Sequence, residues 1–212
     1  NDGNLSGKRG VAFGDSITMG ATYTNDYPNY INVGFSGTRL LENGTDTPHA
    51  QLSMVYLVDA IISGDWAVLE TAASSVSTEF TEALNRLKSV DFNNIDFITI
   101  FYGANDAGTV ATLSNRMGAV DSEARRTWNG AINYVVETIL TNYPHIQIYL
   151  LTPMYRTTEN YITEPLADAM VVQGNRWKLP VLDLHREMGL NHLTVGALTR
   201  DGTHPNDVGN KR

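Results

Sequence analysis

The sequence of 212 residues contains no cysteine, no long hydrophobic run and few charged residues. Without cysteine there are no disulfides, no thiolate metal ligands and no cysteine nucleophile. No stretch of about 18 or more apolar residues occurs, so we expect no integral membrane segment. Charged residues make up 18% of the chain, below the roughly 25% of an average soluble domain.

The charge that is present is mostly negative. Lys and Arg number 15 against 23 Asp and Glu, which gives a net charge of −8. This excess argues against nucleic acid or an anionic membrane surface as a partner. No pair of histidines stands at ligand spacing beside a further carboxylate, so we expect no metal site.

The polar composition bears on where the protein works. Asn, Thr, Ser, Gly and Tyr take the place of the missing charged residues, and the chain begins with Asn1 rather than Met, without a signal peptide. We therefore interpret the chain as a processed or trimmed piece and expect an extracellular or cell-surface protein.

Apolar segments typical of strands alternate along the chain with segments typical of helices. The predicted strands cover residues 10–13, 30–35, 95–102, 146–151 and 179–184. The predicted helices cover residues 52–62, 78–90, 121–142 and 165–177, and a long loop is predicted for residues 103–122. The alternation predicts an α/β protein: one domain over residues 1–212, built as a flavodoxin-like three-layer α/β/α sandwich with a mostly parallel sheet of about five strands.

Three polar segments stand after predicted strands or near the C-terminus. They are Gly14-Asp15-Ser16-Ile17, Gly103-Ala104-Asn105-Asp106 and Asp201-Gly202-Thr203-His204-Pro205. Ligands of open α/β sheets bind beyond the carboxyl ends of the strands, so we expect the three segments to meet there.

The residue types in these segments are typical of a hydrolytic serine site. A serine hydroxyl becomes a good nucleophile when a neutral imidazole, itself held by a carboxylate, lies within hydrogen-bond reach. Ser16 stands at a strand-to-helix turn, and the spacing of Asp201 and His204 allows the carboxylate to face the imidazole. Asn105 and the glycines supply donors for a developing oxyanion. The chain has no Gly-x-Ser-x-Gly motif, which disfavours the ordinary α/β-hydrolase fold.

The segments resemble, in order and over almost the whole chain, the sequence blocks of the GDSL family, also called SGNH hydrolases. The resemblance implies that Ser16 is the nucleophile, that His204 is the base and that Asp201 orients it. The second block is similar to residues 32–37, and this implies an oxyanion-hole N–H from Gly37 rather than from Gly34. The third block implies that the side chain of Asn105 is a further oxyanion donor.

The resemblance implies a serine esterase that hydrolyses carboxylic esters without a metal or organic cofactor. We expect a small-molecule or glycan ester as substrate, with a short acyl group or an acetylated carbohydrate, because residues 22–29 and 107–115 near the expected site are polar. A lipase-like or lysophospholipase-like activity on longer chains is the alternative, with the helical residues 41–91 as an apolar lid. A non-catalytic sugar-binding or adhesive module on the same fold is a third possibility.

Simpler roles are open for several of these residues. Taken alone, Ser16 would fit a helix N-cap and Asn105 a turn residue beside Asp106, but the presence of the other blocks favours the catalytic roles. Asp15 and Asp106 are expected to hold loops through backbone N–H groups.

The remaining histidines offer one rival. Asp183 and His185 form a second Asp-His pair, but we favour His204 because Asp183 closes a predicted strand and would point away from the neighbours of His185. The other histidines, which are His49, His145 and His192, are expected to be solvated.

Overall fold

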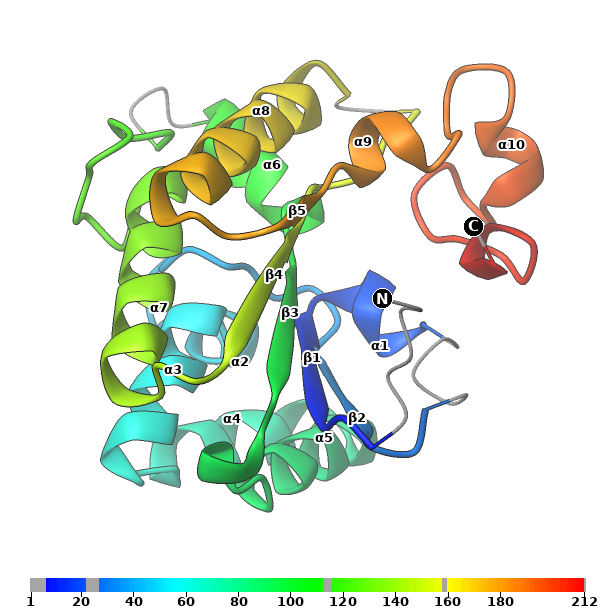
Figure 1. Ribbon diagram of the computed structural model, residues 1–212. Helices are drawn as coiled ribbons and strands as arrows, with labels where there is room; N and C mark the ends of the chain where they lie inside the picture. Colours follow the sequence, from blue (N-terminus) through cyan, green and yellow to red (C-terminus); the bar gives the residue numbers. More distant parts are fainter. Residues whose placement is uncertain (1–6, 22–26, 113–115, 158–159, 212) are drawn as a thin grey trace.

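The computed structural model describes residues 7–21, 27–112, 116–157 and 160–211, which form a parallel five-stranded sheet between helices (Figure 1). The strands are β1 (Gly10–Gly14), β2 (Tyr30–Gly34), β3 (Phe97–Phe101), β4 (Gln147–Leu151) and β5 (Val181–Leu182). They stand in the order β2-β1-β3-β4-β5, and every neighbouring pair is parallel. This is the flavodoxin-like order, and the predicted three-layer α/β/α fold is confirmed.

The helices of the described chain differ widely in length. They are α1 (Ser16–Met19), α2 (Pro48–Gln51), α3 (Met54–Ser63), α4 (Ala67–Val76), α5 (Thr78–Lys88), α6 (Ala104–Thr112), α7 (Trp128–Asn142), α8 (Asn160–Trp177), α9 (Leu184–Glu187) and α10 (Val195–Leu198). Short 3₁₀ turns cover Phe92–Asn94 and Gly209–Lys211. None of the described helices has both the length and the hydrophobicity needed to cross a bilayer.

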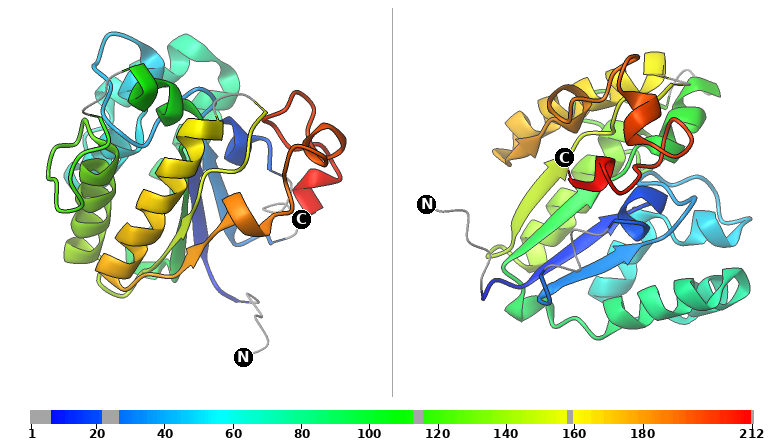
Figure 2. Two further views of the ribbon diagram at one scale, coloured as in Figure 1. Left: turned by 90° about the horizontal axis from the view of Figure 1, so that it is seen from above. Right: turned by 90° about the vertical axis from the view of Figure 1, so that its right-hand side faces the viewer.

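The two faces of the sheet are covered by apolar clusters of unequal size. The larger cluster joins one face to α3, α5, α7 and α8 and includes Leu57, Ile98 and Trp128. The smaller cluster lies on the other face, where α1, α9 and α10 pack (Figure 2). Its buried members are Ile17, Phe101, Met154, Leu190, Val195 and Leu198. The C-terminal part of the chain is therefore attached to the sheet by a small core of its own.

The central strands β1 and β3 bring their carboxyl ends to the same edge. All five residues of β1 are buried, and four of the five in β3 are, as expected for strands covered on both faces. A Cβ at Gly14 would overlap the side chain of Thr18 and the carbonyl of Phe101. Glycine at the end of β1 therefore allows α1 to begin directly after the strand.

Two predicted boundaries around the expected loop were wrong. Residues 103–122 are not all loop, because α6 begins at Ala104. The helix predicted from residue 121 begins only at Trp128, since the Thr127 hydroxyl accepts the N–H of Gly130 and caps it there.

The last helix and strand also differ from the prediction. Helix α8 begins at Asn160, before Pro165, which lies inside it. Proline removes one helical N–H, and burial of Leu166 and Met170 offsets that loss. The strand predicted for residues 179–184 is limited to Val181–Leu182, and α9 follows almost at once.

Candidate active site

Ser16 lies where β1 passes directly into α1. Asp15 is the N-cap of this helix, and its Oδ1 accepts the backbone N–H of Ile17 at 3.0 Å. The N-cap role considered for Ser16 is therefore wrong, because Ser16 is the first helical residue. Its Oγ lies 2.8 Å from Nε2 of His204, so the hydroxyl faces the C-terminal loop.

The loop that carries His204 is closed by its own hydrogen bonds. The N–H of Arg200 donates to the carbonyl of His204 at 2.8 Å. Asp201 Oδ1 accepts the backbone N–H groups of Thr203 at 3.0 Å and of His204 at 2.8 Å. These contacts hold the two side chains together, and Asp201 Oδ2 lies 2.7 Å from His204 Nδ1.

The imidazole of His204 therefore stands between a carboxylate and a hydroxyl. The pKa of Asp201 is lowered to about 2, first because it accepts the backbone N–H of His204 and then because it accepts the side-chain N–H. An ionised carboxylate only accepts, so it keeps a proton on Nδ1. Nε2 of the neutral ring is then an acceptor for the proton of Ser16 Oγ.

A second group of contacts joins Asn105, in the first turn of α6, to the loop after β2. Asn105 Nδ2 donates to the carbonyl of Thr38 at 2.9 Å and, with a longer bond of 3.4 Å, to Oδ2 of Asp15. Gly37 precedes Thr38 and has a φ of 75°, in the left-handed region that favours glycine. Segments distant in sequence thus meet beside Ser16.

The sequence as a whole also matches a known protein family. The sequence profile of the GDSL-like lipase/acylhydrolase family matches residues 12–212. The chain belongs to this family. This GDSL-like protein is accordingly a carboxylic-ester hydrolase.

Solved structures resemble the GDSL-like hydrolase over nearly its whole length. A Lactobacillus plantarum protein is 18% identical with a TM-score of 0.67, over 96% of this chain and 91% of its own. A lipase/acylhydrolase from Enterococcus faecalis is 21% identical with a TM-score of 0.53, over 96% and 90%. An acetyl-xylooligosaccharide esterase variant from Geobacillus Stearmophilus is 15% identical with a TM-score of 0.53, over 97% and 90%. These likenesses show the fold, and no curated protein sequence matches the chain.

The two glycines of the second block have different surroundings in the GDSL-like hydrolase. Gly34 ends β2, where a Cβ would overlap the backbone of Met19 in α1. The N–H of Gly34 donates to Oδ1 of Asn32 at 2.9 Å, so it is already used within the strand. Gly37 instead lies in the loop that contacts Asn105.

Two carboxyl groups are buried beneath this site and bind backbone N–H groups, as predicted. Asp106 accepts the N–H groups of Leu40 and Leu41, both at 3.1 Å. Burial raises the pKa of Asp106 to about 6. Burial also raises the pKa of Asp15 to about 7, against the lowering effect of its bond from Ile17. These groups tie the β2 loop and the turn of α1 to the bottom of the site.

The rival pair is not joined in the structure. His185 is buried, and its Nδ1 lies 3.0 Å from the carbonyl of Pro153. Asp183 Oδ1 accepts the hydroxyl of Thr152 at 3.1 Å. Among the described residues, no hydrogen bond links the side chains of Asp183 and His185, which leaves His204 as the histidine that faces a serine.

The other histidines make none of these hydrogen bonds within the described residues. His145 and His192 are exposed, as predicted. His49 was also expected to be solvated, and this was wrong: it is half-buried, its ring packs edge-on against Phe80 at 5.7 Å, and it lies beside Gly37. Within the part of the chain that the structure describes, no three His, Asp or Glu side chains group as metal ligands would.

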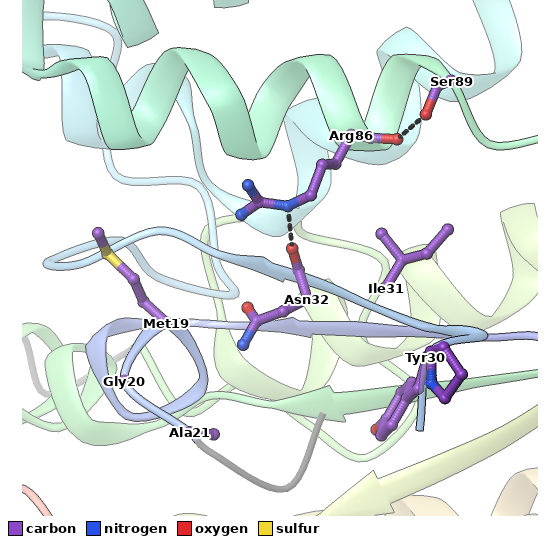
Figure 3. Close-up of a pocket in the computed structure, with 9 residues that line it drawn as sticks. Met19, Gly20, Ala21, Tyr30, Ile31, Asn32, Arg86 and Ser89 are labelled. Atoms are coloured by element: carbon purple, nitrogen blue, oxygen red, sulfur yellow. Dashed lines mark hydrogen bonds between the residues drawn. The ribbon is translucent and has the colours of Figure 1, made fainter. Parts of the chain in front are cut away.

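A pocket of about 650 Å³ lies next to the end of α1, between β2 and α5 (Figure 3). There Arg86 Nε donates to the carbonyl of Asn32 at 3.1 Å, and Ser89 Oγ donates to the carbonyl of Arg86 at 2.7 Å. The described residues that line it include no histidine or carboxylate. Among the described residues the pocket therefore has no general base, and it is not the candidate active site.

Sequence reasoning missed two arginines at the site. Arg39 Nε donates to the carbonyl of Asn105 at 3.2 Å, and Arg156 Nη1 donates to the carbonyl of Ala104 at 2.6 Å. Both bind backbone carbonyls, which no sequence motif records. The only available signal was the position of Arg156 shortly after an apolar strand, at the edge where ligands bind.

Proposed function

We propose that the protein hydrolyses esters by a Ser-His-Asp mechanism with Ser16 as nucleophile. The observation that carries the proposal is the 2.8 Å separation of Ser16 Oγ and His204 Nε2, continued by the 2.7 Å contact of His204 with Asp201. A serine hydroxyl with a carboxylate-held imidazole in hydrogen-bond reach is the arrangement that nucleophilic catalysis requires.

The first half of the reaction transfers the acyl group to the enzyme. Ser16 Oγ forms a bond to the carbonyl carbon of the ester, and its proton moves to His204 Nε2. The tetrahedral intermediate collapses by breaking the bond to the alcohol oxygen, and His204 gives its proton to the leaving alcohol. Asp201 stabilises the imidazolium while it exists.

The second half releases the acid. Water attacks the acyl carbon, its proton passes to His204 Nε2, and the bond between the carbon and Ser16 Oγ breaks. The proton then returns to Ser16 Oγ, which restores the starting state with no external oxidant, reductant or cofactor.

The oxyanion of both intermediates requires nearby donors, for which we propose the backbone N–H groups of Ser16 and Gly37 and the side chain of Asn105. Asn105 is suited to this role because its bond to Asp15 is long, at 3.4 Å. The N–H of Asn105 that makes this bond is redirected to the fully charged oxyanion at small cost. The 2.9 Å bond to Thr38 keeps the amide in position.

We propose short-acyl esters or acetylated carbohydrates as substrates. Met54, Val55 and Leu57, which a lid would have to present to a lipid chain, are wholly buried in the main core. The shared fold with an acetyl-xylooligosaccharide esterase is in keeping with this class. Of the polar segments that suggested it, residues 22–26 and 113–115 lie outside the described residues.

Replacement of Ser16 tests the mechanism directly. Ser16→Ala should remove turnover of p-nitrophenyl acetate by about a millionfold and abolish covalent labelling by a fluorophosphonate probe. Ser89→Ala is the matched control, because it removes an exposed serine from the pocket of Figure 3 and should leave turnover and labelling unchanged. Circular dichroism shows whether each variant is folded. Near-native turnover by folded Ser16→Ala would overturn the proposal.

A further inference from the structure

Arg156 lies between two segments of the proposed active site. It follows β4, and its Nη1 donates to the carbonyl of Ala104 at 2.6 Å while its Nε donates to Oγ1 of Thr203 at 3.2 Å. Ala104 directly precedes Asn105, and Thr203 directly precedes His204. One planar side chain therefore spans the distance between the proposed oxyanion donor and the proposed base.

The residue after Arg156 strengthens the same junction. The N–H of Thr157 donates to the carbonyl of Gly202 at 3.2 Å. Gly202 has a φ of 84°, and a Cβ there would overlap the side chain of Thr157. The loop that carries Asp201 and His204 thus sits directly on residues 156–157, with a shape that requires glycine at the contact.

The guanidinium of Arg156 also reaches the segment of the nucleophile. Arg156 and Asp15 line the same small cavity together with Ile17 and Tyr102. The positive charge of Arg156 opposes the rise that burial causes in the pKa of Asp15. Arg156 is therefore close to all three segments that meet at the site.

Apart from the smaller apolar cluster, few contacts among the described residues hold this loop against the sheet. Its own hydrogen bonds close it internally, but the side chain of Asp201 is 53% exposed, and α10 before it is only four residues long. A displacement of about 1 Å between reacting groups is enough to lower a rate by about a hundredfold. The planar guanidinium of an arginine, held by two hydrogen bonds, resists such a displacement better than the flexible ammonium group of a lysine does.

We infer that Arg156 is a positioning residue for ester hydrolysis, which holds the Asp201–His204 loop at a fixed distance from Asn105 and Ser16. This inference rests on the proposed function. The Nε and Nη1 donors of Arg156 bind the protein rather than substrate, so Arg156 acts through the residues that it holds.

The primary experiment compares turnover per competent active site. Fluorophosphonate titration counts the competent sites in each preparation, and p-nitrophenyl acetate turnover is divided by that count. Arg156→Ala should lower kcat per site by about ten- to a hundredfold with KM within about threefold of the native value. Arg156→Lys keeps the charge and one donor, and should restore part of the loss. Arg176→Ala, an exposed arginine against Trp177 at the end of α8, is the matched control and should keep native kcat.

A double-mutant cycle tests whether Arg156 acts through the loop. Thr203→Val removes the bond to Arg156 Nε and should lower kcat per site by severalfold. The double variant should be no slower than Arg156→Ala alone, because both changes break the same contact. Thr203→Val alone and Arg156→Lys keep the test decisive if Arg156→Ala does not fold.

The outcomes separate this inference from the proposed function. If Ser16→Ala is inactive and unlabelled while both Arg156 variants keep native kcat per site, Arg156 has no positioning role and the mechanism stands. Fully additive effects of the Arg156 and Thr203 changes would also overturn the inference. If Ser16→Ala remains active, the proposed function itself has failed.

Discussion

At the scale of single residues, the chain of hydrogen bonds from Ser16 through His204 to Asp201 combines one long-range and one short-range contact. Asp201 and His204 lie three positions apart, so a closed loop is enough to join them. Ser16 and His204 are separated by 188 positions, and only the folded sheet brings them together. The reactivity of the Ser16 hydroxyl therefore depends on the fold of the sheet, which sets its distance from His204.

The first prediction at this scale concerns Asn105. Asn105→Ala should lower kcat by roughly a hundred- to a thousandfold, because it removes a donor aimed at charge that develops only in the transition state. KM should change little for the same reason. Asn142→Ala, which removes an exposed amide that donates to the carbonyl of Thr138 in the same helix, is the control for amide truncation. A large rise in KM at constant kcat would make Asn105 a substrate-binding residue instead.

The second prediction distinguishes the two Asp-His pairs by pH. Protonation of the catalytic imidazole removes the acceptor for the Ser16 proton, so kcat/KM should fall as the pH is lowered. Asp201, with its pKa lowered to about 2, stays ionised throughout that fall and adds no step of its own. His204→Ala should abolish activity, whereas His185→Gln should keep both the activity and its acid limb. An active His204 variant with an inactive His185 variant would reverse the assignment.

At the scale of elements, the turn from β1 into α1 is held by a buried acid. Asp15 caps the four-residue helix α1, and α1 packs through Ile17 into the smaller apolar cluster. So short a helix does not form by its own propensity, because nucleation is unfavourable and few bonds follow. The cap and the packing of Ile17 therefore determine where Ser16 stands.

The prediction for this element is a loss of stability with rising pH. Burial raises the pKa of Asp15 from 3.8 to about 7, so between these values the folded state holds a proton that the unfolded state has lost. Raising the pH through this window then favours unfolding, by about 4 kcal/mol for an isolated group with this shift. Asp15→Asn keeps an oxygen for the Ile17 N–H and has no proton to lose. Urea titrations should show that the free energy of unfolding of the native protein, minus that of Asp15→Asn, falls from pH 4 to pH 7.

An exposed cap provides the control for that measurement. Asp91 accepts the N–H of Asn93 at 3.1 Å in the same manner as Asp15 binds Ile17. The pKa of Asp91 is lowered, first by its bond from Asn94, so its contribution to stability is lost only as the pH falls below the ordinary range of aspartate. The free energy of unfolding of the native protein, minus that of Asp91→Asn, should therefore not decline from pH 4 to pH 7. A difference for Asp15→Asn that is equally flat would contradict the prediction.

At the scale of the whole molecule, sheet topology assembles the candidate site. Strands β1 and β3 are neighbours, β2 lies beside β1, and all run in parallel, so the segments that follow them meet at one edge. The C-terminal loop completes this edge from the other face, where the smaller cluster supports it (Figure 2). Helices α3, α4 and α5, which lie between β2 and β3 in the sequence, pack into the larger apolar cluster and not into the smaller one.

The prediction at this scale concerns acyl chain length. Acetyl and butyryl esters should be cleaved with higher kcat/KM than octanoyl or longer esters, because a pocket for a long chain would need apolar lining worth about 0.8 kcal/mol for each buried CH₂. A p-nitrophenyl ester series measures this, with Ser16→Ala as the blank for uncatalysed hydrolysis. A kcat/KM that rises steadily from acetyl to decanoyl would favour the lipase-like alternative.

Helix α3 offers a separate check of the lid hypothesis. Ile62 is its most exposed apolar residue, at 38% exposure. If α3 covered a lipid chain, Ile62→Ser would lower the rate for long esters selectively. We expect the ratio of acetyl to octanoyl kcat/KM to be unchanged, as it should be for the control Val68→Ser in α4, where the side chain is 58% exposed.

The sequence by itself determined the sheet and indicated the candidate reacting residues. Buried parallel strands are apolar on both faces, so the runs that became β1 and β3 were visible without any tertiary information. The chemistry of Ser16, Asp201, His204 and Asn105 could be named because their segments carry fixed spacings and stand at strand ends. Periodicity of apolar residues also predicted the helix that became α5, whose buried side chains are Phe80, Ala83, Leu84 and Leu87.

Tertiary structure alone decided where the elements begin and what supports the site. Thr127 rather than periodicity starts α7, and α6 forms in a segment that reads as loop, with its first turn bound to the β2 loop through Asn105 and Asp106. Arg39 and Arg156 bind backbone carbonyls of residues more than forty positions away. Any residue presents a carbonyl, so such contacts leave no pattern in the sequence, and they exist only once the chain has folded.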